Sequence, residues 1–164
     1  MTDGRESIRQ AFERTDAIEA REDGYTVTTT VFDSRVTVTD GEVPVYVVTM
    51  EVPTLATATE DDIGPAVAEG WLETLERRLA EASKATRRRI DLDRFDLDSD
   101  GESVRIEYKF THENTDVGVD TAKTLVEYVE GTYVESTIPG YEYTDPVSTL
   151  LAAASQSGEG GTPL

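Results

Sequence analysis

Hydrophobic residues recur along the chain with two spacings, and the change from one spacing to the other predicts where helices and strands lie. Apolar residues that return every three or four positions predict helices over residues 5–20, 66–89, 117–133 and, more briefly, 147–154. Apolar residues that alternate with polar ones, among many β-branched and aromatic side chains, predict strands over residues 25–32, 35–39 and 44–52 and two more within 90–110.

Turn residues separate these segments and set the order of the elements. Asp40-Gly41 is typical of a two-residue hairpin turn, residues 98–101 predict a second turn, and one of residues 114–116 can cap the last long helix. The resulting order, α-β-β-β-α-β-β-α, predicts an α+β fold. We expect an antiparallel sheet of about five strands with the helices packed on it.

The length of the chain suits one domain with a substantial core. Of its 164 residues, 37% are hydrophobic, and their regular spacing favours a folded protein over a solvated coil. We expect a single domain over residues 1–154. Residues 155–164 are rich in Gly and Ser, which predicts a disordered C-terminal tail.

Charge is the strongest feature of the composition. Thirty-four acidic residues against fifteen basic ones give a net charge of −19, and Lys is scarce beside Arg. In ordinary buffer such a charge pushes the compact state apart, whereas at ~1 M salt the Debye length falls to ~3 Å and the repulsion is screened. The acids are dispersed along the chain, which favours adaptation to molar salt over the alternative of an acidic interaction protein from a low-salt organism.

The same composition bears on compartment and partners. Without cysteine, the chain has no disulfide, thiolate metal site or cysteine nucleophile. The N-terminal residues lack a basic region followed by an apolar run, and the apolar-rich stretch 43–55 is too short to span a bilayer, so we expect a cytoplasmic protein. Its negative field disfavours nucleic acid and anionic membranes as partners.

One motif has the spacing of a calcium-binding loop. Residues 96–101 read Asp-Leu-Asp-Ser-Asp-Gly, with Glu107 at the twelfth place, so that Asp96, Asp98 and Asp100 could supply hard oxygen ligands. Ser103 stands where such loops have an apolar residue, and the alternation over 104–110 predicts a strand instead of the usual following helix. We therefore favour an acidic hairpin turn and assign no metal ligand.

A basic run, Arg87-Arg88-Arg89, closes the predicted central helix. It could contact phosphate groups of a nucleic acid, or it could complete the helix C-terminus and pair with nearby acids. The net charge of −19 and the lack of interleaved aromatic residues favour the second interpretation.

The remaining candidates also have structural explanations. His112 is the single histidine, and without a second histidine or a cysteine it has no evident catalytic partner, so we interpret it as a loop residue. Tyr128, Tyr133, Tyr141 and Tyr143 could form a binding surface, but we favour a role in packing the terminal segment onto the core. No catalytic residue or cofactor is assigned.

Two resemblances accompany these patterns. Residues 130–134, Glu-Gly-Thr-Tyr-Val, and 138–143, Ile-Pro-Gly-Tyr-Glu-Tyr, resemble a small uncharacterised haloarchaeal family, a domain of unknown function, and the usage of Arg, Val and Thr is similar to that of haloarchaeal proteins. The order of elements over residues 5–135 resembles that of type III secretion chaperones. The resemblances imply a fold and a habitat but no functional residues.

Taken together, these observations favour a non-enzymatic protein-interaction or adaptor domain of a halophilic archaeon, with another protein as its partner. An alternative is a metal-dependent or carboxylate-based enzyme that uses Asp96, Asp98 and Asp100. A third possibility is nucleic-acid binding through Arg87–Arg89.

Overall fold

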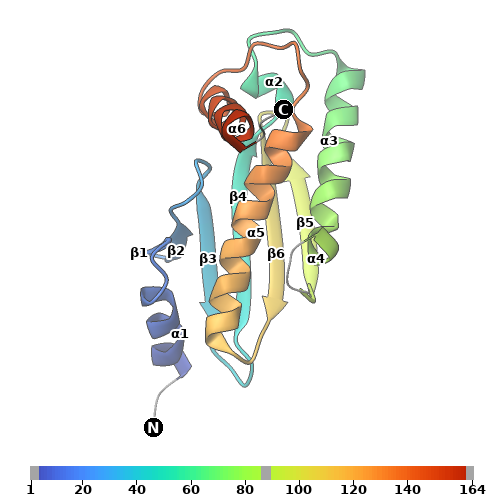
Figure 1. The fold of residues 1–164 in the computed structure, drawn as a ribbon. Helices are drawn as coiled ribbons and strands as arrows, with labels where there is room; N and C mark the ends of the chain where they lie inside the picture. The colour runs from blue at the N-terminus through green and yellow to red at the C-terminus, as the bar shows by residue number, and fades with distance from the viewer. Residues whose placement is uncertain (1–3, 86–89, 162–164) are drawn as a thin grey trace.

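A computed structural model describes residues 4–85 and 90–161, and within these ranges helices lie against one face of a six-stranded antiparallel sheet (Figure 1). The strands, in sheet order, are β1 (Ile18–Arg21), β2 (Gly24–Val27), β3 (Ser34–Thr39), β4 (Val45–Pro53), β6 (Ser103–Thr111) and β5 (Arg94–Ser99). The helices are α1 (Gly4–Glu13), α2 (Leu55–Ala58), α3 (Pro65–Ala80), α4 (Ala82–Ala85), α5 (Thr115–Ser136) and α6 (Val147–Gly161). The predicted α+β class with an antiparallel sheet is confirmed.

The centre of the sheet is the pairing of β4 with β6, two strands that are not consecutive in the chain. Their register runs from Val45 opposite Thr111 to Pro53 opposite Ser103. Because successive side chains point to opposite faces, every second residue of both strands is buried under the helices. These buried residues are Tyr46, Val48, Met50, Val52, Val104, Ile106, Tyr108 and Phe110.

Helix α5 covers this centre. Its buried side chains lie on one face of the helix, and Figure 1 shows the helix running along β4 and β6. Tyr46 and Phe110, neighbours on β4 and β6, stack with ring centroids 4.9 Å apart. The ring of Tyr46 also lies against Gly118, where a side chain larger than hydrogen has no room.

Tyrosine hydroxyls tie the layers together. Tyr108 donates a hydrogen bond of 2.6 Å to the carbonyl oxygen of Leu79 at the end of α3, and Tyr133 of α5 donates one of 2.8 Å to that of Pro53. Each bond gives a buried polar group a partner, which avoids the cost of desolvating it unpaired. The hydroxyl of Tyr46 has no hydrogen-bond partner among the described residues, and burial raises its pKa to about 12.

The first predicted helix is too long. Residues 5–20 were expected to be helical, but α1 ends at Glu13 and Ile18–Arg21 form strand β1. The hydroxyl of Thr15 donates to the carbonyl oxygen of Ala11, and the chain then turns so that Ile18 pairs with Val27. Ile18 is buried through the sheet, so its apolar character fits a strand as well as the helical spacing.

The strand predicted over residues 25–32 is also too long, because β2 ends at Val27. Residues 28–33 leave the sheet and are held by two carboxylates of α5. Glu127 accepts a hydrogen bond of 2.6 Å from the Thr29 hydroxyl, and Glu130 accepts bonds from the backbone N–H groups of residues 31 and 32. A side chain distant in sequence thus satisfies donors that would otherwise pair with a strand. Burial raises the pKa of Glu130, although these hydrogen bonds oppose the shift.

Other boundaries differ by smaller amounts. The helix predicted over 66–89 is divided into α3 and α4, and α2 lies in the expected loop, capped by the Thr54 hydroxyl, which accepts from the backbone N–H of Thr57. Strands β5 and β6 both lie within residues 90–110 or end one residue beyond, as expected, and β5 begins at Arg94. Helix α5 is capped by Asn114, one of the predicted candidates.

The C-terminal helix also exceeds its predicted length. Helix α6 begins at Val147 as expected and continues past residue 154 to Gly161. The disorder expected for residues 155–164 in solution stays a prediction.

We predict that Gly118→Ala destabilises the protein by about 1–3 kcal/mol, because an added Cβ would lie 2.2 Å from Cζ of the Tyr46 ring. Gly131→Ala, in the same helix, is the matched control: a Cβ there meets nothing within 4 Å, and the better helix propensity of Ala should stabilise by about 0.5–1 kcal/mol. Denaturant unfolding of both variants in molar KCl measures the difference. Equal effects of the two substitutions would contradict the close packing of Tyr46 on α5.

Candidate functional site

The sheet has a second face, which we call the outer face. It consists of those residues of β3, β4, β5 and β6 that alternate with the buried ones. Whereas the inner residues of β4 and β6 are buried, the outer residues of all four strands are half-buried or exposed. An antiparallel sheet with one face packed on helices typically presents the other to solvent or to a partner.

The strand register arranges the outer face in rows that cross the sheet. One row contains Thr49, Glu107 and Asp96, and the adjacent row contains Val47, Lys109 and Arg94. An acidic pair therefore lies beside a basic pair. On the far side of the acidic row, Arg105 lies between Glu51 and Asp98.

Charges on the outer face balance, in contrast to the chain as a whole. Among the described residues of its four strands, four basic and four acidic side chains belong to this face: Arg35, Arg94, Arg105, Lys109, Glu51, Asp96, Asp98 and Glu107. Glu107 forms an ion pair of 3.5 Å with Arg105, and Asp96 forms one with Arg94. The net charge of the whole chain is −19.

A shallow hollow of about 500 Å³ lies on this face. Its walls are side chains of β3, β4 and β6, including Thr37, Val47 and Thr49 between Arg35 and Glu107. The hollow is open to solvent and mixes apolar with charged groups. Such a surface suits contact with another macromolecule better than enclosure of a small ligand, which prefers a deep and mainly apolar cavity.

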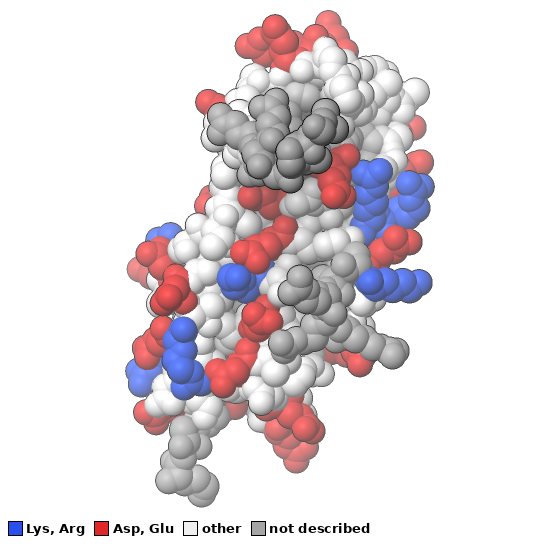
Figure 2. All heavy atoms as spheres, viewed as in Figure 1, with Lys and Arg blue, Asp and Glu red and all other residues white. Residues whose placement is uncertain are grey.

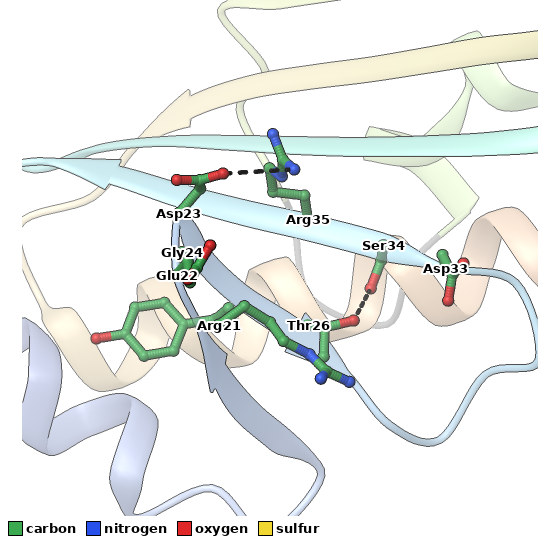
Figure 3. Close-up of a pocket in the computed structure, with 9 residues that line it drawn as sticks. Arg21, Glu22, Asp23, Gly24, Thr26, Asp33, Ser34 and Arg35 are labelled. Carbon is green, nitrogen blue, oxygen red and sulfur yellow. Dashed lines mark hydrogen bonds and ion pairs between the residues drawn. The ribbon is translucent and has the colours of Figure 1, made fainter.

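A second hollow lies beside the first, at the hairpin of β1 and β2 (Figure 3). In it, Arg35 pairs with Asp23 at 3.8 Å, and the hydroxyls of Thr26 and Ser34 lie 3.4 Å apart. Ser34 Oγ also accepts a hydrogen bond from the backbone N–H of Val27. These groups hold β2 against β3, so their chemistry is explained by the fold.

The calcium-loop residues lie on the β5–β6 hairpin. Asp96 and Asp98 belong to β5 and share the outer face, and the register places Glu107 directly opposite Asp96. Residues 100–102 connect the two strands, so positions on either side of the connection pair in order and Glu107 lies beside Asp96 on the sheet.

The carboxylate of Asp100 stabilises the turn between β5 and β6. Its Oδ1 accepts hydrogen bonds of 2.9 and 2.8 Å from the backbone N–H groups of Glu102 and Ser103, and these bonds lower its pKa. Gly101 follows with a φ of +93°, a conformation that favours glycine. Within residues 4–85 and 90–161, no group of three or more His, Asp or Glu side chains lies close enough to hold a metal ion.

The basic run Arg87–Arg89 lies outside the described residues. Arg78, which precedes this run near the end of α3, donates hydrogen bonds to the carbonyl oxygen of Glu135 and to Oγ of Ser136, at 3.3 and 3.0 Å. Arg78 therefore joins the end of α3 to the end of α5.

His112 and the late tyrosines make contacts within the fold. His112 Nδ1 accepts a hydrogen bond of 2.9 Å from the backbone N–H of Asn114, in the connection to α5. The hydroxyl of Tyr128 donates to the carbonyl oxygen of Arg78, and that of Tyr143 bonds to the backbone of Ile138. These contacts, with that of Tyr133 to Pro53, are consistent with the predicted packing role for Tyr128, Tyr133 and Tyr143, and Tyr141 is half-buried.

Comparison with known proteins gives a family but no activity. The model of a family of unknown function, DUF5813, matches residues 8–153. The chain belongs to this family. No curated protein and no solved structure matches this DUF5813 member, so the topological resemblance to type III secretion chaperones stays a prediction. None of the helices in the described part of the chain has the length and apolarity needed to cross a membrane.

We predict that calcium leaves the β5–β6 hairpin unchanged. Because Asp100 already accepts two backbone hydrogen bonds and Asp96 pairs with Arg94, the carboxylates do not converge on one ion. Amide resonances of residues 96–107 should therefore stay in place during a CaCl₂ titration in molar KCl. Saturable shifts in this hairpin, lost in Asp98→Asn, would instead support a calcium site.

Proposed function

We propose that this DUF5813 member is a non-enzymatic protein-interaction domain, in which the outer face of the sheet is the contact surface. The observation that carries the proposal is the balance of charge on this face within a chain of net charge −19. A surface that carries both signs can approach another acidic protein without the repulsion that an acidic surface imposes.

The shape and polarity of the face support the same function. Val47 and Thr49, the β4 members of the two charged rows, are half-buried and form a small uncharged strip bordered by charged groups. Protein contact surfaces combine an apolar centre with a polar rim in this way. The backbone of the face is fixed by strand pairing on both sides of β4 and β6, so that little order has to be gained on binding.

We further propose that the protein works in the salt-rich cytoplasm of a halophilic archaeon. On the helix-covered side, acidic side chains are spread over the whole visible surface, whereas basic ones gather mainly at its two edges with one group near the middle (Figure 2). Exposed ion pairs such as Arg9 with Glu13 at 3.9 Å contribute little stability on their own. Dispersed acids therefore serve hydration and solubility, and the repulsion between them is tolerated where salt screens it.

We predict that Val47→Glu abolishes partner binding while the fold is retained. Val47 lies in the centre of the outer face beside Lys109, which can pair with the new carboxylate, so that the substitution disturbs the contact surface more than the domain. Affinity capture from a salt-adapted host, with crosslinking before a wash in molar KCl and an untagged copy of the chain expressed beside the tagged one, should give a protein partner by mass spectrometry with the unchanged chain only.

The matched control is Val67→Glu, which places the same new charge at an exposed position of α3. It should capture the same partner as the unchanged chain. Loss of the partner with Val67→Glu and its retention with Val47→Glu would place the contact surface on the helices. Turnover of a metabolite by the purified protein would overturn the non-enzymatic assignment.

Stability should rise steeply with salt. Raising KCl from low concentration to ~1 M shortens the Debye length to ~3 Å and screens the repulsion among the excess acids. Thermal unfolding at a series of KCl concentrations measures the effect, with tetramethylammonium chloride as a second salt that tests general screening. A midpoint that does not change with salt concentration would contradict the salt-adapted assignment.

A further inference from the structure

The rows of the outer face are complementary to each other. Glu107 and Asp96 form the acidic pair of one row, and Lys109 and Arg94 form the basic pair of the next. On each strand, corresponding positions are two residues apart, a step of about 7 Å. A rotation that exchanges the two rows therefore places each acid against a base.

Such an exchange is what a two-fold axis produces. If two copies of the sheet face each other about an axis that crosses the strands between these rows, the residue at one position meets its row neighbour in the other copy. Glu107 then meets Lys109 of the second copy, and Asp96 meets Arg94 of the second copy. On β4 the same operation brings Thr49 of one copy against Val47 of the other, so that uncharged residues contact uncharged residues.

We propose that the partner bound by the outer face is a second copy of this chain, and that the two form a symmetric dimer about this axis. The inference rests on the proposed function and names the partner of the same surface. Charge is the reason for choosing this occupant: a second copy also carries −19, so it repels the chain unless the surfaces that meet are balanced and complementary.

The size of the face predicts a weak dimer. Four strands of six to nine residues span roughly 19 Å across the sheet and 20–30 Å along it, with strands about 4.8 Å apart and about 3.3 Å per residue. About 400–600 Å² per copy is at the low end for specific protein interfaces, so dimerisation should depend on concentration in the micromolar to millimolar range. Ion pairs enclosed in the interface are screened less by salt than exposed ones.

Two single charge reversals test the row exchange. Lys109→Glu makes both rows acidic on β6, and Glu107→Lys makes both rows basic, so that each variant meets like charges in its own dimer. Sedimentation velocity in molar KCl should show self-association at least about tenfold weaker for each variant than for the unchanged chain. A 1:1 mixture of the two variants should associate again, because every like-charge contact becomes an opposite-charge contact.

Controls separate this contact from a general effect of charge. Lys123→Glu, on α5, and Glu73→Lys, on α3, repeat the two charge changes on the helix-covered side and should leave self-association unchanged. Circular dichroism checks the fold of every variant. Should a reversal unfold the chain, Lys109→Gln and Glu107→Gln replace it, each with an expected weakening of several-fold.

The outcomes distinguish the inference from the proposed function. A chain that stays monomeric to millimolar concentration, or a mixture that does not associate better than its components, overturns the dimer. If the same chain captures a different protein and loses it with Val47→Glu, the outer face is still a contact surface and only the identity of its partner is wrong. If Val47→Glu changes neither self-association nor capture, both proposals fail.

Discussion

The pairing of β4 with β6 is the interaction on which the rest of the structure depends. It joins β1–β3 to the β5–β6 hairpin, although α2, α3, α4 and β5 all lie between β4 and β6 in the described part of the chain. Its alternation makes one face apolar, which recruits α5 through contacts such as Tyr46 against Gly118, and it makes the other face polar. The register of β4 with β6 therefore determines both the residues of the core and the residues of the outer face.

That register also decides which charges become neighbours. Glu107 and Lys109 are two residues apart on β6, but they become parts of rows only because β5 brings Asp96 and Arg94 alongside them. On the helix-covered side, acidic side chains are instead spread over the visible surface. Only strand pairing arranges the charges of this DUF5813 member in adjacent rows of opposite sign among the residues of β5 and β6.

The clean alternation over β4 and β6 and the apolar face of α5 made the centre of the fold predictable. Local patterns failed where a distant residue decided the outcome. Ile18 suits a helix and a strand equally, and residues 28–33 have strand propensity but are held by Glu130 of α5. The site followed the same rule: the polar positions of β6 were visible in the sequence, whereas the rows needed strand pairings that no local pattern specifies.

The carboxylates of Glu130 and Asp100 have a structural role in addition to their contribution to the net charge. Both accept hydrogen bonds from backbone N–H groups. Glu130 thereby takes the place of a neighbouring strand for residues 31 and 32, and Asp100 stabilises the turn before β6. Acids in this chain are consequently of two kinds: those that contribute charge and hydration, and those whose carboxylates also accept hydrogen bonds from the backbone. A redesign that lowers the net charge for use in dilute buffer could neutralise acids of the first kind that lie away from the outer face. It would have to leave Glu130 and Asp100 in place, together with Asp40 and Asp61, whose carboxylates accept hydrogen bonds from the backbone N–H groups of Gly41 and Glu142, since replacing them removes supports for the chain and not only charges.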